Sequence, residues 1–115
     1  SDAEKKVFNK FHELESVKDK IDFVSKLSPS FEKEMSLRII GRNFYDLLPQ
    51  NIKNDYDLSI LNVVEQDLPD HMGRKRNSVE KALNNIRKIM SDPSKYDNQQ
   101  FDILKSYESY LLNRG

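Results

Sequence analysis

Residues 28–49 read SPSFEKEMSLRIIGRNFYDLLP, and this stretch decides the fold. Pro29 and Pro49 bound it, and proline marks element boundaries because it fixes φ, lacks an N–H and disfavours helix at the preceding residue. Ser28 followed by Pro29 is a favourable helix start. The apolar side chains between the prolines recur at helical spacing; they are Phe31, Met35, Leu37, Ile40, Phe44, Leu47 and Leu48, with Ile39 widening the stripe. We therefore expect a central helix over Phe31–Leu48.

Gly41 lies inside this expected helix, where glycine costs about 1 kcal/mol relative to alanine. We expect that a neighbouring helix approaches closely at this point and leaves no room for a side chain. The alternative is a kink in the helix beside a functional groove.

Helical spacing continues on both sides of the central stretch, and no segment shows the sustained alternation of a strand. The further apolar stripes cover residues 7–14, 17–27, 52–68, 79–90 and 101–111. Three helix starts have a polar residue followed three positions later by an acid or amide, the spacing of a capping box; the pairs are Ser16 with Asp19, Asn77 with Glu80, and Asp97 with Gln100. Asp55 or Asp57 could cap the helix that follows Pro49. The sequence predicts an all-α fold, a compact bundle of five or six short helices forming a single domain over residues 1–115.

The composition fits one folded domain with a lean core, since 37% of residues are hydrophobic and 33% are charged. The chain has no cysteine, which excludes disulfides, thiolate metal sites and a cysteine nucleophile and fits an intracellular, cytoplasmic protein. No run approaches the roughly 18 apolar residues that a membrane-spanning helix needs, so we expect no membrane partner. The chain opens with Ser1 rather than Met, which leaves open that it is a fragment of a longer protein.

Residues that could carry catalysis are scarce. His12 and His71 are the only histidines, and His12 is not followed by the second histidine of the His-Glu-x-x-His zinc motif. Gly73 has no neighbouring glycines, so the sequence contains no phosphate-binding glycine loop. We predict no catalytic, cofactor-binding or metal-binding residues and no cofactor, and a small helical enzyme is the third of our functional hypotheses.

The charges are balanced overall but are separated along the chain. Lys plus Arg and Asp plus Glu both number 19, so the whole molecule has no bulk attraction for nucleic acid. Residues 54–70 contain five acids and no Lys or Arg, whereas residues 73–90 contain six bases and one acid. Pro69 lies near the boundary between the two segments. Either the two segments lie antiparallel and neutralise each other, or one of them faces a partner.

Three consecutive cations, Arg74, Lys75 and Arg76, precede the helix expected over residues 79–90. Cations at a helix N-terminus oppose the helix dipole, so a functional reason is worth considering, although a solvated loop compensated by Asp67 and Asp70 would also explain them. Our leading hypothesis is a non-enzymatic protein–protein interaction or regulatory module that binds an acidic partner surface through this basic helix N-terminus. The predicted contact residues are Arg74, Lys75, Arg76, Lys81 and Lys88.

The alternative hypothesis is a helix-turn-helix-like DNA-binding module that uses residues 74–88. The first helix and turn would lie within Leu68–Arg76, and the recognition helix would cover Ser78–Met90. The residues expected to reach phosphates and base edges are Lys81, Asn84, Asn85 and Lys88. Pro69 and Gly73 leave little room for a first helix, which weakens this interpretation.

Two apolar features are candidates for a secondary interface. Tyr110 and Leu112 lie off the apolar stripe of the last helix and could form an exposed edge that anchors a partner. The wide stripe of Ile39, Ile40 and Phe44 is compatible with a helical homodimer.

Overall fold

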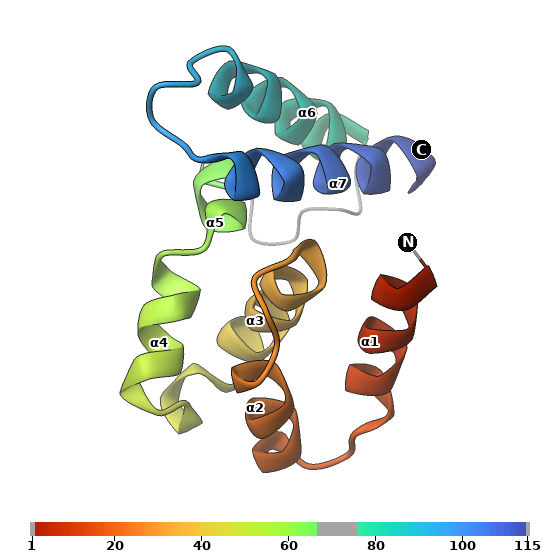
Figure 1. Ribbon diagram of the computed structural model, residues 1–115, viewed down its shortest axis with the longest axis vertical. Helices are drawn as coiled ribbons and strands as arrows, with labels where there is room; N and C mark the ends of the chain where they lie inside the picture. The colour runs from red at the N-terminus through yellow and green to blue at the C-terminus, as the bar shows by residue number, and fades with distance from the viewer. Residues whose placement is uncertain (1, 67–75, 115) are drawn as a thin grey trace. The chain divides into compact units, whose positions relative to one another are not determined.

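The fold is all-α, as the sequence predicts (Figure 1). The computed structural model describes residues 2–66 and 76–114, and every regular element in these two ranges is a helix. The chain forms two compact units, Ser1–Ser59 and Ile60–Gly115. The first unit contains α1 (Asp2–Glu13), α2 (Val17–Ser25), α3 (Phe31–Phe44), the 3₁₀ helix η1 (Tyr45–Leu47) and α4 (Gln50–Asp57). The second contains α5 (Ile60–Val64), α6 (Arg76–Met90) and α7 (Asn98–Arg114).

Helix α3 is the centre of the first unit, where it packs against α1, α2, α4 and η1 (Figure 1). Its apolar residues form a buried cluster with side chains from the surrounding elements; the members are Phe11, Val24, Leu37, Ile40, Leu48 and Ile52. Helix α3 is therefore central to this unit, because its wide apolar stripe packs against several other elements.

Both ends of α3 differ from the prediction. The N-cap is Ser30 rather than Ser28, because the Ser30 hydroxyl accepts a hydrogen bond from the Lys33 N–H at 3.1 Å. At the other end α3 stops at Phe44, and η1 carries the chain to Leu48, whose backbone is extended before Pro49. The tighter turn of η1 moves Leu47 off the apolar stripe, so that its side chain is 66% exposed.

The close approach expected at Gly41 is confirmed. A Cβ atom placed on Gly41 would lie 2.1 Å from Cδ1 and 2.3 Å from Cε1 of Tyr56 in α4. Gly41 is itself buried, so the ring of Tyr56 occupies the space that any larger residue at position 41 would need.

The apolar stripe over residues 52–68 does not form one helix. Helix α4 begins after Pro49 and ends at Asp57, so that neither Asp55 nor Asp57 caps it, and α5 begins at Ile60. Leu58, at the break, is 82% exposed, whereas the next residue, Ser59, is 3% exposed. At this break the Ser59 hydroxyl donates a hydrogen bond to the Glu34 carboxyl group of α3, a contact outside the stripe.

In the second unit, α5 packs against α6 and α7, and α6 packs against α7. Figure 1 shows α6 and α7 side by side, joined by the loop that follows Met90. The apolar side chains buried in this unit are Ile60, Leu61, Val64, Ala82, Leu83, Ile86, Ile103, Leu104, Tyr107 and Leu111. Each unit therefore has buried apolar side chains of its own.

Two of the three predicted capping boxes lie at helix starts. The Ser16 hydroxyl accepts from the Asp19 N–H at 3.0 Å. Asp97 and Gln100 form the full reciprocal pair, because the Gln100 N–H donates to Asp97 Oδ1 at 2.8 Å and the Asp97 N–H donates to Gln100 Oε1 at 3.0 Å. Asn77 lies inside α6, which already begins at Arg76, so the predicted cap at this position is wrong.

Replacing Asp97 with alanine should lower the free energy of unfolding by about 0.5–2 kcal/mol, because the first turn of α7 loses the acceptor for the Gln100 N–H. The matched control is Asp102→Ala, which removes an exposed acid from the same helix without touching the cap. Urea denaturation followed by circular dichroism measures both variants. Equal losses in the two variants would show that the capping box does not stabilise α7.

Candidate functional site

Helix α6 is amphipathic, and its exposed side is mostly basic. Ala82, Leu83 and Ile86 are buried on one side. The exposed residues on the other side are Glu80, Lys81, Asn84, Arg87 and Lys88. Within this set, Lys81, Asn84 and Lys88 are spaced i, i+3 and i+7, so they lie in line along the helix, and we call these three residues the basic face of α6. The rise of the helix places the backbones of Lys81 and Lys88 about 10 Å apart along its axis.

The structure brings together two of the five predicted contact residues. Lys81 and Lys88 lie on the basic face, and both are exposed. Arg76 is the first residue of α6, and only its backbone is described. Arg74 and Lys75 lie outside the described residues. The described part of the predicted site is therefore the exposed side of the helix rather than its N-terminus.

Arg87 forms an ion pair with α7. Its Nε lies 3.8 Å from Glu108 Oε2 of α7, and the side chains are 60% and 30% exposed. An ion pair this exposed is worth about 0–1 kcal/mol. One expectation was that acids of the segment 54–70 neutralise the basic segment, whereas the acid paired with Arg87 lies on α7.

The described acids of the segment 54–70 lie in different surroundings. Asp55 and Asp57 belong to α4 in the first unit. Glu65, in the second unit, is 7% exposed, and its Oε1 accepts a hydrogen bond of 2.7 Å from the Tyr107 hydroxyl of α7. Asp67 and Asp70 lie outside the described residues. Glu65 is thus part of the core of the second unit, a role that its residue type does not reveal.

The expected outward position of Asn85 is wrong. Its Nδ2 donates a hydrogen bond of 2.7 Å to the Val64 carbonyl at the end of α5, and the side chain is half-buried. Asn85 therefore satisfies a carbonyl at the end of α5 instead of pointing outward from α6. The expected recognition helix, Ser78–Met90, is helical within α6, and the expected first helix falls almost wholly outside the described residues.

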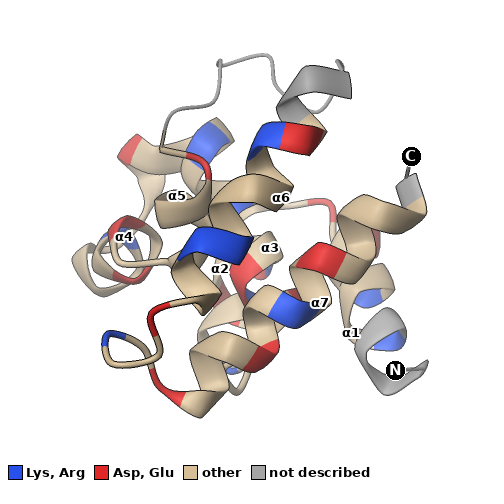
Figure 2. Cartoon of the chain, turned by 90° about the horizontal axis from the view of Figure 1, so that it is seen from above, with Lys and Arg blue, Asp and Glu red and all other residues tan. Residues whose placement is uncertain are grey.

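The distribution of charge differs between α6 and α7 (Figure 2). Along α7 the signs alternate, with Asp102, Lys105 and Glu108 at intervals of three residues. On α6, among the charged residues whose side chains the structure describes, Glu80 is an exposed acid and Lys81, Arg87 and Lys88 are exposed bases. Among the described side chains, bases thus outnumber acids on α6, whereas the two signs alternate on α7.

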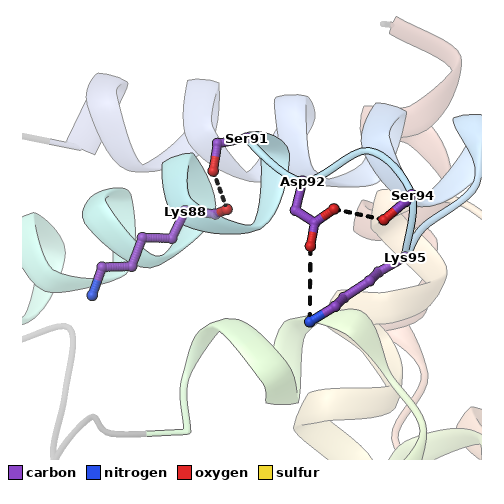
Figure 3. Close-up of polar contacts among 5 residues, drawn as sticks. All are labelled: Lys88, Ser91, Asp92, Ser94 and Lys95. Carbon is purple, nitrogen blue, oxygen red and sulfur yellow. Dashed lines mark hydrogen bonds and ion pairs between the residues drawn. The ribbon is translucent and has the colours of Figure 1, made fainter.

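The loop after α6 fixes the end of the basic face. The Ser91 hydroxyl donates to the Lys88 carbonyl at 2.7 Å, and the Ser94 hydroxyl donates to Asp92 Oδ1 at the same distance (Figure 3). The bond from Ser94 lowers the pKa of Asp92, and Lys95 Nζ lies 3.8 Å from Asp92 Oδ2. Figure 3 shows the Lys88 side chain extending away from Asp92, so its ammonium group is not neutralised by this loop.

The secondary candidates do not form a shared surface. Leu112 is 56% exposed, whereas Tyr110 is partly buried with its ring centroid 6.3 Å from that of Tyr107. Residues two apart on a helix do not face each other, so Tyr110 and Leu112 do not make the predicted edge. Ile40 is fully buried, and Ile39 and Phe44 pack against the same core cluster of the first unit. The stripe offered for a homodimer is therefore used inside the fold.

The other polar residues that the structure describes do not form a metal site or an enclosed polar pocket. His12 is exposed, with ring contacts to Phe8 at 4.4 Å and Phe11 at 5.4 Å, and His71 lies outside the described residues. Within residues 2–66 and 76–114, no group of His, Cys, Asp and Glu side chains could hold a metal ion. An open hollow of about 510 Å³ in the second unit is lined by Met90, Asn98, Phe101, Asp102 and Lys105. Its polar lining residues are all exposed, as on an ordinary protein surface.

The comparisons with known proteins found no relative of this chain. The chain matches no protein-family model, no curated protein and no solved structure. In the part of the chain that the structure describes, no helix is long and apolar enough to cross a lipid bilayer. Any function must therefore be argued from the geometry of the chain's own residues.

Proposed function

We propose that this chain is a non-enzymatic helical module that binds an acidic protein surface through the basic face of α6. The observation that carries the proposal is the line of Lys81, Asn84 and Lys88 on one exposed side of a helix whose other side is buried. Burial of Ala82, Leu83 and Ile86 holds the backbone of this line in place, so the two ammonium groups project from a fixed base. Such an arrangement gives a partner electrostatic complementarity and a defined register.

A protein partner is favoured over duplex DNA by two features of α6. Asn85, which a recognition helix would need for base contacts, is committed to the Val64 carbonyl. Glu80 lies on the exposed side of the same helix, where a carboxylate would repel phosphates. An acidic protein surface accepts such a mixed face, because a polar partner residue can meet Glu80 while acids meet the lysines.

Reversing both lysines, Lys81→Glu with Lys88→Glu, should weaken binding of a fluorescently labelled polyglutamate peptide roughly tenfold at low salt. Exposed charge pairs contribute about 0.2–1 kcal/mol each, and reversal replaces each attraction with a repulsion. The matched control is Lys18→Glu with Lys26→Glu, which makes the same change in net charge at exposed positions of the first unit. Fluorescence anisotropy measures the affinities.

Two outcomes would contradict the proposal. An equal loss in the control would show that net charge, and not the basic face, governs binding. A random-sequence DNA duplex that binds more tightly than the peptide, with an affinity that falls steeply as salt rises, would favour the DNA-binding alternative.

A further inference from the structure

One side of α7 is exposed along nearly the whole length of the helix. Its residues recur at alternating intervals of four and three, so they stay in line along the helix. They are Asn98, Asp102, Lys105, Ser109 and Leu112, and all of them are exposed. The opposite side of α7 is buried among the apolar side chains of the second unit. We call these five residues the outer face of α7.

The outer face has a hollow near one end and an exposed apolar side chain at the other. The open hollow of about 510 Å³ lies along the N-terminal half of the face, and Met90 and Phe101 are the half-buried apolar residues of its lining. Leu112, in the last turn of α7, is 56% exposed. The backbones of Phe101 and Leu112 lie about 16 Å apart along the helix axis. Leu112 is therefore too far away to fill the hollow of its own chain, but it can reach the hollow of a second copy.

The charges between these two ends are self-complementary. Asp102 and Lys105 lie one turn apart, and neither forms an ion pair with a residue that the structure describes. Two antiparallel copies of α7, related by a two-fold axis midway between these residues, place Asp102 of each copy opposite Lys105 of the other.

The same axis brings Leu112 to the hollow of the other copy. Leu112 lies about 13 Å beyond the axis, and Asn98 lies about 8 Å from the axis on the other side. Side chains on a helix lean toward its N-terminus, which moves the Leu112 side chain back toward the axis. It therefore lies over the Asn98 end of the opposite hollow.

We propose that a second copy of this chain docks on the outer face of α7, with the two helices antiparallel about a two-fold axis. Leu112 of each copy enters the hollow of the other, and Asp102 of each copy pairs with Lys105 of the other. The leucines and the charges together fix one register. The contact is a single pair of helices, each about 25 Å long, so it is small and the dimer should dissociate on dilution. It uses no residue of the basic face of α6, so its test is independent of the proposed function.

Sedimentation velocity of the full chain from micromolar to millimolar concentration measures the association, and the average mass should rise toward that of two copies. Leu112→Asp should weaken the association at least about tenfold, because the dimer then loses two buried leucines. The matched control is Leu58→Asp, which makes the same change at an 82% exposed leucine of the first unit and should leave the association unchanged. Circular dichroism checks that both variants are folded.

A charge exchange tests the register separately from the leucine. Asp102→Lys and Lys105→Asp should each weaken self-association at low salt, because each variant places like charges opposite each other in its own dimer. A mixture of the two variants should form a heterodimer, since the two lysines of one copy then lie opposite the two aspartates of the other. The control mixture combines Asp102→Lys with Lys18→Asp, which carries the same net charges but leaves position 105 unchanged, and it should associate more weakly. A wild-type chain that stays monomeric at millimolar concentration, an equal loss in Leu58→Asp, or equal association in the two mixtures would overturn the proposal.

Discussion

Replacing Gly41 with valine should lower the free energy of unfolding by about 1–3 kcal/mol, because the new side chain has no space against α4. A Cβ at this position would lie 2.1–2.5 Å from three atoms of the Tyr56 ring, including Cγ, which is close to the backbone and cannot swing far. The ring or the helix must therefore move, and α3 packs against several elements that oppose the movement. Urea denaturation measures the loss.

A second substitution shows whether the ring is the cause. In a Tyr56→Ala background the space opposite Gly41 is open, and Gly41→Ala should then stabilise the chain by about 1 kcal/mol through helix propensity. With Tyr56 in place, the same Gly41→Ala change also overpacks the contact with the ring. Its effect on the free energy of unfolding should therefore be less favourable than in the Tyr56→Ala background. A loss of the same size in both backgrounds would mean that the glycine is needed for a reason other than Tyr56.

Features that depend on neighbours in the sequence could be predicted, and Gly41 is the clearest case. A glycine inside a strongly apolar helical stripe favoured a packing reason over a kink, because the stripe around it already indicated a central helix. The pairs at Ser16 and Asp97 are equally local, since both partners of each cap lie three residues apart. The cap of α3 was misplaced by two residues, because Ser28 and Ser30 are both suitable caps beside Pro29.

Features that depend on the fold could not be predicted from spacing. The stripe from Ile52 to Leu68 has helical periodicity throughout, yet the helix breaks at Leu58, beside the bond from Ser59 to Glu34, 25 residues earlier. The same limit applies to the candidate site. Lys81 and Lys88 were placed correctly on an exposed face by their spacing, but Asn85 looked like another outward polar residue. Its partner at Val64 is 21 residues away and is visible only in the packed helices.

Replacing Tyr107 with phenylalanine should lower the free energy of unfolding by about 1–3 kcal/mol, because the buried Glu65 carboxyl group loses a hydrogen-bond donor. The Tyr107 hydroxyl lies 2.7 Å from Glu65 Oε1, and the two residues are 1% and 7% exposed, so water is not at hand to replace the lost hydroxyl. The ring itself remains, so the effect reports the hydrogen bond and not the packing of α5 against α7. Thermal and urea unfolding measure the loss.

The matched control is Tyr96→Phe, which removes a hydroxyl from a half-buried ring that packs edge-on against Phe101 and should change stability by less than about 0.5 kcal/mol. A Glu65→Met background completes the double-mutant cycle. In that background the Tyr107 hydroxyl no longer has the Glu65 carboxyl group as its acceptor. Removing the hydroxyl should therefore be nearly neutral or stabilising. If Tyr107→Phe is as costly in the Glu65→Met background as in the wild-type chain, the hydroxyl stabilises the second unit through another partner, and the carboxyl group of Glu65 must be explained by something other than its bond to α7.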